Sequence, residues 1–180
     1  MALPDYFKTE PNANSGTAVY WGDTGASSAT LRLGFNGLAD AAGRMGEVFD
    51  LGAQFHQRYS VGLAIETGTA PVAGTVVEGY LAFSHDGVSW PGLVTGSDAA
   101  YPLIVATNKK QLGNPAIMFI AVNTGNFTQR QAPTVIRPWA RYVAPVVVNL
   151  LGQSVRSTTA ASNNSRLTMI PLAALVQDTA

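Results

Sequence analysis

The chain has no cysteine among its 180 residues, and it has only two histidines, His56 and His85. The absence of cysteine excludes disulfide bonds and thiolate metal sites, and it fits a cytosolic or virion protein better than a small secreted one. The sequence also lacks the HExxH, Walker-loop and GxGxxG motifs and the GxSxG nucleophile elbow. We therefore expect a protein that is not an enzyme and that binds no cofactor.

Charged residues are scarce, at 12% of the chain, which is about half the usual share in a soluble protein. Eleven Lys and Arg residues balance eleven Asp and Glu residues, so the formal net charge is zero. This balance, without a basic cluster, argues against nucleic acid as the main ligand. Net charge helps to keep a free monomer soluble. Two explanations therefore stay open: a neutral surface rich in Ser, Thr, Asn and Gly, or a surface buried against other copies or a partner.

Long apolar runs are also missing, and none approaches the roughly 18 residues that span a bilayer. The first residues lack the apolar stretch of a signal peptide, so we expect neither a membrane segment nor secretion. Residues 1–16 contain two prolines and two asparagines, which is typical of an extended arm. We expect this arm to precede one domain over residues 17–175 and a loose tail over 176–180. Tyr6 and Phe7 are candidate interface residues, as the apolar anchors of the arm.

A strand pattern covers Ala140 to Leu150, where the residues alternate between two faces. One face carries Ala140, Tyr142, Ala144, Val146, Val148 and Leu150, and the other carries Arg141, Val143, Pro145, Val147 and Asn149. Period-two alternation with Val and Tyr predicts a strand of a sandwich. A loop rich in Ser, Thr and Asn follows over Gly152–Ser165, and Arg166–Leu172 returns to a strand pattern. Polar loops on a β-scaffold favour a protein that presents a surface.

Short apolar runs separated by glycine-rich turns predict the other strands. These runs are Thr17–Trp21, Glu47–Leu51, Gln54–Glu66, Thr75–Ser84, Val88–Trp90, Tyr101–Thr107 and Ala116–Asn123. The Asp86-Gly87 pair predicts a hairpin in which Val88–Trp90 begins the return strand. Leu38–Met45 allows at most a turn or two of helix, and no other helix is expected. About eight or nine short strands predict an all-β fold, an antiparallel β-sandwich or a barrel.

Three aspartates, Asp23, Asp86 and Asp98, lie in glycine-rich segments where carboxylates and carbonyls could hold calcium. The spacing of a DxDxDG-type calcium loop is missing, so we favour the alternative that these side chains accept backbone N–H bonds in turns. His85 beside Asp86 could orient an imidazole for base catalysis. No motif supplies the nucleophile or the oxyanion site that such catalysis needs. We expect no metal site and no catalytic residue.

The three tryptophans, Trp21, Trp90 and Trp139, all lie at the ends of strand patterns. Each is a candidate for packing at the edge of the core, for anchoring an interface or for stacking against a sugar. We assign Trp21 and Trp139 to candidate interfaces. Trp90 and Asp86 are the candidate ligand contacts if the domain binds carbohydrate.

Four runs in the C-terminal half carry a resemblance, namely RYVAPVVVNLLGQS, SRLTMIPL, YLAFSHDGVSWPG and YPLIVAT. The first two look like the closing strands of small virion proteins of tailed bacteriophages, and the other two are similar to the middle of those proteins. The runs cover about Thr75 to Leu172, whereas the N-terminal half matches no pattern of the family. The resemblance implies a β-sandwich capsid decoration (cement) protein. Such a protein is usually a homotrimer that binds the major capsid protein, which implies a place on the capsid surface of the virion.

Two of the same pieces also fit a second pattern. Ser84–Trp90 matches an SxDGxxW hairpin, and Ala140–Val143 matches the start of an ARYVRL-type strand, in which Ala144 replaces the expected Arg. These pieces resemble the galactose-binding-like (discoidin) jelly rolls. The resemblance implies a jelly-roll-like sandwich under either function. It keeps open an alternative function, a carbohydrate-binding module or a tail or fibre component of a phage particle.

Overall fold

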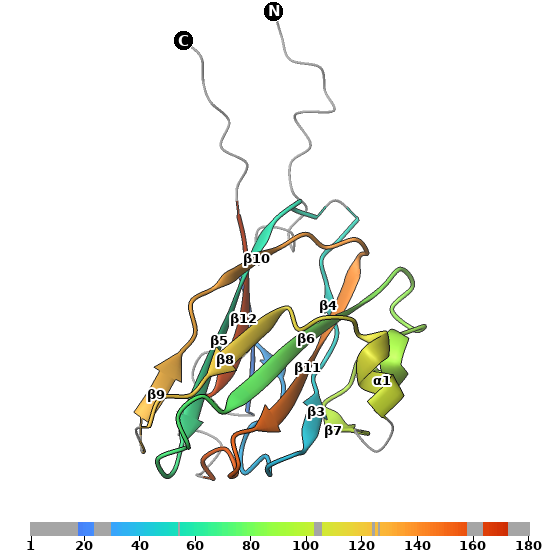
Figure 1. The fold of residues 1–180 in the computed structure, drawn as a ribbon. Helices are drawn as coiled ribbons and strands as arrows, with labels where there is room; N and C mark the ends of the chain where they lie inside the picture. The colour runs from blue at the N-terminus through green and yellow to red at the C-terminus, as the bar shows by residue number, and fades with distance from the viewer. Residues whose placement is uncertain are drawn as a thin grey trace, which may run out of the picture.

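The computed structural model describes residues 18–23, 30–53, 55–102, 106–123, 125, 127–157 and 164–172. The predicted arm over 1–16, with Tyr6 and Phe7, and the predicted tail over 176–180 lie outside the described residues. The described strands form two sheets that pack face to face, with short helical segments on the outer side of one of them (Figure 1). The fold is a β-sandwich, as the sequence predicts.

Each sheet contains six of the described strands. The first sheet has the order β10-β5-β12-β1-β2, with β9 also paired to β5, and consists of β1 (Val19–Gly22), β2 (Leu31–Arg32), β5 (Tyr59–Thr67), β9 (Phe127–Arg130), β10 (Thr134–Ile136) and β12 (Arg166–Pro171). The second has the order β7-β3-β11-β6-β8, with β4 also paired to β11, and consists of β3 (Gly43–Met45), β4 (Phe49–Asp50), β6 (Val76–Ser84), β7 (Ala99–Tyr101), β8 (Ile117–Ile120) and β11 (Tyr142–Leu150). Among the described strands, only the pair β1–β2 is parallel.

The chain passes from one sheet to the other between consecutive long strands. Strand β5 belongs to the first sheet and β6 to the second, and β11 belongs to the second and β12 to the first. Strands β6 and β11 pair along their whole length, from Tyr142 opposite Ser84 to Leu150 opposite Val76. Strand β12 lies between β5 and β1. These crossings give the sandwich a jelly-roll-like connectivity, and they confirm the two strands expected near the C-terminal end of the chain.

A core of buried side chains fills the space between the sheets. Its largest members include Trp21, Phe35, Tyr59, Leu63, Ile65, Phe119, Leu151, Leu167 and Met169. Strand β11 contributes Val143 and Val147 to this core, whereas Val146 and Val148 on its other face belong to a second buried cluster. A strand that is buried on both faces is apolar on both, which explains the valine-rich sequence of β11.

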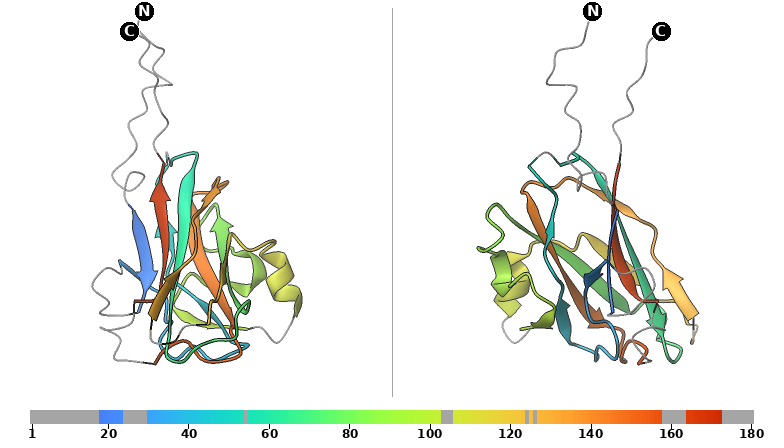
Figure 2. Two further views of the ribbon diagram at one scale, coloured as in Figure 1. Left: turned by 60° about the vertical axis from the view of Figure 1, so that its left-hand side comes forward. Right: turned by 180° about the vertical axis from the view of Figure 1, so that it is seen from behind.

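Helix α1 (Ala106–Gln111) and the 3-10 turn η2 (Pro91–Leu93) cover part of the outer face of the second sheet (Figure 2). An ion pair of 2.5 Å between Lys109 Nζ and Glu78 Oε2 joins the helix to β6. The helix corrects the expectation of a strand over Tyr101–Thr107 and of a fold without a convincing helix. Six residues are too few to show a helical period in the sequence. The apolar residues that precede the helix in the sequence therefore predict a strand.

The return strand expected over Val88–Trp90 does not form. The amides of Val88 and Ser89 donate to the Asp86 carboxylate, each at 2.8 Å, and are therefore diverted from a ladder with β6. Pro91 then starts η2. A side-chain carboxylate has replaced the backbone of a partner strand as the acceptor, which is how aspartate competes with regular structure.

Glutamine side chains join the two sheets along one side of the sandwich. Strand β8 is the edge of the second sheet, and the amide of Ile120 donates to Gln131 Oε1 at 3.2 Å. Gln129, on β9 of the first sheet, accepts from the amide of Val122 at 2.9 Å and donates to the carbonyl of Val122 at 3.1 Å. These bonds satisfy backbone groups that have no strand beside them.

The polar loop after β11 is tied to β5 through Glu66, whose side chain is buried. The carboxylate accepts from the amide of Asn164 at 2.8 Å and from the guanidinium of Arg156. The amide of Glu66 itself donates to Ser165 Oγ at 2.8 Å. Buried charges persist only when they are paired and hydrogen-bonded, so Glu66 fixes both described ends of the loop.

Candidate functional site

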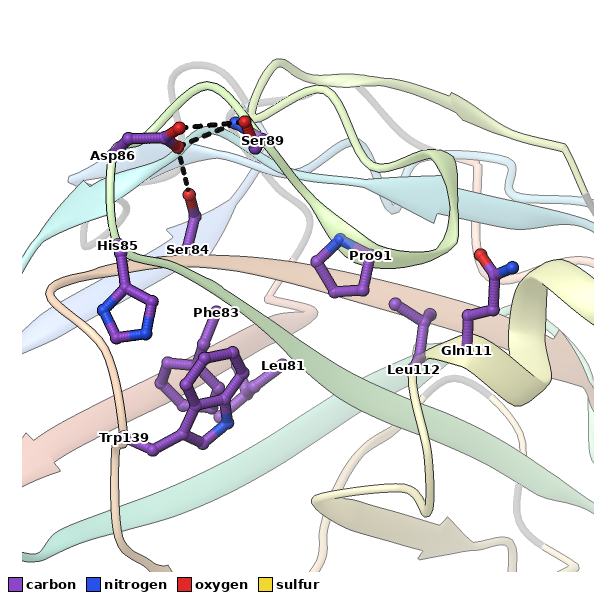
Figure 3. Close-up of a pocket in the computed structure, with 10 residues that line it drawn as sticks. All are labelled: Leu81, Phe83, Ser84, His85, Asp86, Ser89, Pro91, Gln111, Leu112 and Trp139. Carbon is purple, nitrogen blue, oxygen red and sulfur yellow. Dashed lines mark hydrogen bonds between the residues drawn. The ribbon is translucent and has the colours of Figure 1, made fainter.

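A pocket of about 400 Å³ opens beside the end of β6 (Figure 3). Strand β8 pairs with β6 only as far as Gly79, so the later residues of β6 have no described strand on that edge. The floor of the pocket is apolar and consists of Leu81, Phe83, Pro91 and Leu112. Its rim is polar and consists of Ser84, His85, Asp86, Ser89 and Gln111, with Trp139 at one side. Three segments that are distant in the sequence therefore meet at this pocket.

Trp139, on the segment before β11, is 60% exposed. Its ring lies 5.7 Å from that of Phe83 and 5.5 Å from that of His85, centroid to centroid, and both rings are inclined to it, by 54° and 65°. Inclined and edge-on arrangements are the favoured geometries of aromatic pairs. The indole is therefore held in place by two neighbours while much of it faces solvent, where an interface or a ligand can reach it.

The loop after β6 is organised by the Asp86 carboxylate. Oδ1 accepts from Ser84 Oγ and from the amides of Val88 and Ser89, and Oδ2 accepts from Ser89 Oγ, all at 2.8 Å. Gly87 has φ of +73°, a conformation that suits glycine, and its amide donates to Ser84 Oγ at 3.0 Å. The expectation that Asp86 accepts backbone N–H bonds in a turn is confirmed.

We expect the Asp86 carboxyl to titrate well below its ordinary pKa of 3.8. The bonds from the backbone of Ser89 and Val88, and then from the hydroxyls of Ser84 and Ser89, lower this pKa because they favour the ionised form. The folded-state pKa is lower than the unfolded one. Stabilisation by these bonds is therefore complete above about pH 4 and is lost as pH falls through the lowered value.

An NMR titration of the Val88 and Ser89 amides checks this expectation. Their chemical shifts should stay constant from neutral pH down to about pH 3. A titration midpoint near the ordinary value of 3.8 would contradict the hydrogen-bonded loop.

The other two tryptophans differ from Trp139. Trp90 is half-buried, packs against the second cluster and donates from Nε1 to the carbonyl of Gly87 at 3.2 Å. Trp90 supports the loop and does not line the pocket. Of the two candidate ligand contacts, only Asp86 lines the pocket. Trp21 is fully buried, with Nε1 bonded to the carbonyl of Glu47 at 2.8 Å. Its assignment to an interface is wrong, because the core already encloses the whole side chain.

The other two aspartates considered for calcium also have protein partners. Asp98 Oδ1 accepts from Arg44 Nε at 2.7 Å and from the amide of Gly34 at 3.0 Å. Burial acts to raise the pKa of Asp98, but the bonds from Arg44 and Gly34 outweigh it and lower the pKa. Asp23 Oδ1 accepts from the amide of Asn36 at 2.9 Å, and burial raises its pKa. The Arg44 guanidinium thus occupies the position beside Asp98 that a cation would take. The described residues contain no group of three His, Asp or Glu that could hold a metal ion.

The pocket does not arrange its polar groups for nucleophilic catalysis. The hydroxyl of Ser84 donates to Asp86 and not to an imidazole. The His85 ring lies against Trp139, and the Asp86 carboxylate is directed to the serines and amides of its own loop. A nucleophile needs a base within hydrogen-bonding reach that a third group orients. These hydrogen bonds hold the loop itself in one conformation.

A second feature of the surface is an apolar strip on β8. Met118 and Ile120 on the strand, and Val122 just after its end, alternate with buried residues and are 42%, 53% and 57% exposed. Across the outer face of the second sheet, Ile120 lies opposite Val76, which in turn lies opposite Leu150. We call Met118, Ile120 and Val122 the β8 strip. Helix α1 and η2 cover the other part of this face, where the second buried cluster lies.

The outer face of the first sheet carries a smaller apolar patch. Val135 on β10 and Ile170 on β12 lie opposite Ser60 on either side of β5. Their exposed fractions are 58% and 40%. The sandwich thus exposes apolar side chains on the outer faces of both sheets. The sequence did not predict either surface. An apolar run such as Ala116–Asn123 is equally typical of a strand with one exposed face and of a strand buried on both faces.

No helix in the described ranges is long and apolar enough to cross a membrane. Comparison of the chain with protein-family models, with curated proteins and with solved structures finds no match.

Proposed function

We propose that this chain is a structural subunit of a tailed-bacteriophage particle, which binds the outer surface of the capsid and stabilises it as a decoration (cement) protein. Its partners in this proposal are the major capsid protein and further copies of itself, arranged as a trimer. The resemblance of residues 75–172 to small virion proteins supports it, and the β-sandwich is the fold which that resemblance implies.

The β8 strip is the observation that carries the proposal. Full burial of an exposed apolar side chain of this size is worth about 1.5–3 kcal/mol. The three side chains of the strip are about half exposed, so covering them gains about half of this for each. The chain also has a formal net charge of zero and only 12% charged residues, so charge repulsion between copies is weak. Neighbouring exposed apolar side chains are a common feature of protein contact sites, and this supports the proposal.

The patch of Val135 and Ile170 supports contact with more than one neighbour. It lies on the first sheet, whereas the β8 strip lies on the second. A cyclic trimer requires two different surfaces for each pair of neighbouring subunits, and the capsid requires a further one. Trp139, the exposed tryptophan assigned to an interface, adds another surface side chain. The roles of Tyr6 and Phe7 in the arm stay predictions.

Replacement of Ile120 by lysine is expected to weaken binding to capsids that lack this protein by at least about tenfold, which is about 1.4 kcal/mol. The lysine places a charge in the middle of the β8 strip, where its desolvation opposes contact. The fold should tolerate it, because a lysine is common on edge strands and the Ile120 amide keeps its bond to Gln131. Co-sedimentation with capsids measures the affinity, and light scattering measures the mass of the free protein.

Val72→Lys is the matched control, since Val72 is 70% exposed in the loop between β5 and β6 and lies off the strip. It should bind capsids as the unmodified chain does. Equal binding by the Ile120→Lys and Val72→Lys variants would remove the strip from the interface. A monomer that does not sediment with capsids would contradict the proposed function itself.

A further inference from the structure

We propose that the edge of β6 beyond its pairing with β8 is a docking site for the N-terminal arm of a neighbouring copy, in which Asp5–Thr9 adds to the second sheet as an antiparallel strand. This contact rests on the association between copies in the proposed function, and it involves neither the β8 strip nor the capsid. Three features carry it: open backbone groups on β6, apolar walls on both sides of that edge, and the sequence of the arm.

The backbone groups of Leu81 and Phe83 point away from β11, toward the side where β8 has ended. Successive residues of an antiparallel strand alternate between bonding a given neighbour and facing away from it. Leu81 lies opposite Pro145, which has no N–H, and the Pro145 carbonyl accepts from the amide of Gly46 on the other side of β11. Leu81 and Pro145 therefore exchange no hydrogen bonds. Phe83, two residues further along β6, has the same orientation as Leu81.

The pairing with β8 gives the same orientation. The amide of Ala121, directly after β8, donates to the carbonyl of Thr75 at 2.8 Å. The odd-numbered residues at this edge therefore turn their backbone groups toward β8. Leu81 and Phe83 continue this odd-numbered row beyond Gly79, the last residue of β6 that lies opposite β8.

Within the described ranges, these backbone groups of Leu81 and Phe83 have no hydrogen-bond partner. If β8 began earlier in the same register, Pro115 would lie opposite Leu81, and it has no amide to donate; β8 begins instead at Ile117. Leu81 and Phe83 are each 8% exposed, and buried backbone groups are nearly always hydrogen-bonded. The edge thus presents two donors and two acceptors to a chain that lies beside it.

Apolar side chains stand on both sides of this edge, where they line the pocket of about 400 Å³. Phe83 and the nearby ring of Trp139 lie on the side of the core between the sheets. Pro91 in η2 and Leu112, which packs against the second buried cluster, lie on the side of the outer face (Figure 3). Successive side chains of a strand point to opposite faces, so an added strand directs them alternately to these two walls.

The arm contains a segment of matching pattern. Asp5–Thr9 lies between the two prolines of the arm and itself contains none, so every residue of the segment keeps its amide for a ladder. The adjacent Tyr6 and Phe7 point to opposite faces of such a strand and supply one ring to each wall. Residues 173–180, the other terminal segment outside the described ranges, contain no aromatic side chain.

A neighbouring copy supplies the arm more directly than the chain itself. Antiparallel pairing is slightly more stable than parallel pairing, and β8 is already antiparallel to β6. An antiparallel segment leaves the edge near Tyr80, whereas β1, which follows the arm, begins at the end of the sandwich toward which β6 runs (Figure 1). The chain's own arm must therefore reverse its direction to reach β1.

The linking residues 10–17 span up to about 30 Å when extended, which reaches a neighbour without such a reversal. The arm and the β6 edge are two different surfaces, so each copy can give its arm to the next around a ring. Contacts of this kind close in a cyclic trimer.

Hydrogen exchange of the full chain tests the docking site, at concentrations where light scattering shows the oligomer. The amides of Leu81 and Phe83 should exchange at least about tenfold more slowly than in a double variant with Tyr6→Asp and Phe7→Asp. Two aspartates cannot fill the apolar walls, so the edge is uncovered. The double variant with Asn12→Asp and Asn14→Asp is the matched control. It adds the same charge to the same arm outside Asp5–Thr9 and should keep the slow exchange.

Cysteine cross-linking identifies the copy that supplies the arm, and the chain has no cysteine of its own to interfere. Asp5→Cys and His85→Cys are made in separate chains, which are then mixed under mild oxidation. His85 is exposed and directly follows β6, so we expect a disulfide-linked dimer of the two chains. Val72→Cys replaces His85→Cys in the control, because Val72 is 70% exposed but does not line the pocket. This control mixture should give no dimer.

Equal exchange of the Leu81 and Phe83 amides in the two aspartate variants would overturn the docking site. A monomer at every concentration would overturn it as well. A cross-link that forms only within a chain carrying both cysteines would assign the arm to its own copy and contradict the exchange between copies. Far-UV circular dichroism confirms that each variant is folded. Co-sedimentation with capsids is measured on the same variants, so that loss of the arm contact and loss of capsid binding are seen separately.

Discussion

Replacement of Trp21 by alanine is expected to lower the free energy of unfolding by about 3–5 kcal/mol, the largest effect of any substitution considered. The indole is completely buried between the sheets, its ring lies 6.3 Å from that of Phe49, centroid to centroid, at nearly a right angle, and Nε1 bonds to the carbonyl of Glu47. The substitution leaves a cavity and an unsatisfied carbonyl. Because whole domains are stable by only about 5–15 kcal/mol, this one change removes a large part of the total. Urea unfolding followed by far-UV circular dichroism measures it.

Two further variants make the result interpretable. Trp21→Phe keeps an aromatic ring but removes the bond to Glu47, so its loss should be intermediate. Trp139→Ala removes the same side chain from an exposed position, and we expect a loss of less than about 1 kcal/mol. Similar losses at Trp21 and Trp139 would contradict the assignment of one tryptophan to the core and the other to the surface.

Replacement of Asn149 by leucine is expected to cost about 3 kcal/mol. Asn149 is fully buried at the end of β11. Its Nδ2 donates to the carbonyls of Leu38 and Gln153 at 2.9 and 2.8 Å, and its Oδ1 accepts from the amide of Leu151 at 3.1 Å. Leucine has a similar size but none of these groups, so the Gln153 carbonyl and the Leu151 amide lose these bonds, while the Leu38 carbonyl keeps the bond from the Val155 amide. Equilibrium unfolding in urea gives the difference.

Asn123→Leu is the control for this change, because Asn123 is exposed after β8; its effect should stay within about 0.5 kcal/mol. A loss at Asn149 that is no larger than at Asn123 would mean that the three bonds contribute nothing measurable. Hydrogen exchange at the Leu151 amide provides a second measurement, and exchange should be faster in Asn149→Leu.

The sequence predicted the strands that follow a local rule. The valine-rich run from Ala140 to Leu150 became β11 (Tyr142–Leu150), and the apolar run Thr75–Ser84 became β6 (Val76–Ser84). The predicted return strand failed because a nearby side chain competes with a partner strand for the backbone amides, which strand periodicity does not reveal. Val88 and Ser89 belong to a loop because their amides meet the Asp86 carboxylate.

The candidate site was predictable only in part. The turn at Asp86 follows from the short-range pattern Ser84-His85-Asp86-Gly87, since all its hydrogen bonds join residues at most three positions apart. Which tryptophan is exposed depends on contacts across long separations. Trp21 bonds to the carbonyl of Glu47, and Trp139 lies against Phe83. No spacing in the sequence signals such contacts, so the three tryptophans became distinguishable only in the structure.

The glutamine bonds at β8 restrict how copies of this chain can associate. An open edge strand invites growth by strand addition, which has no natural end and leads to fibres. Here the outward amides of Ile120 and Val122 are already bonded to Gln131 and Gln129, while the side chains of Ile120 and Val122 stay exposed. Contact through this region is therefore made by side chains and not by a continued ladder. Side-chain contacts of this kind favour closed, reversible assemblies of limited size over endless polymers.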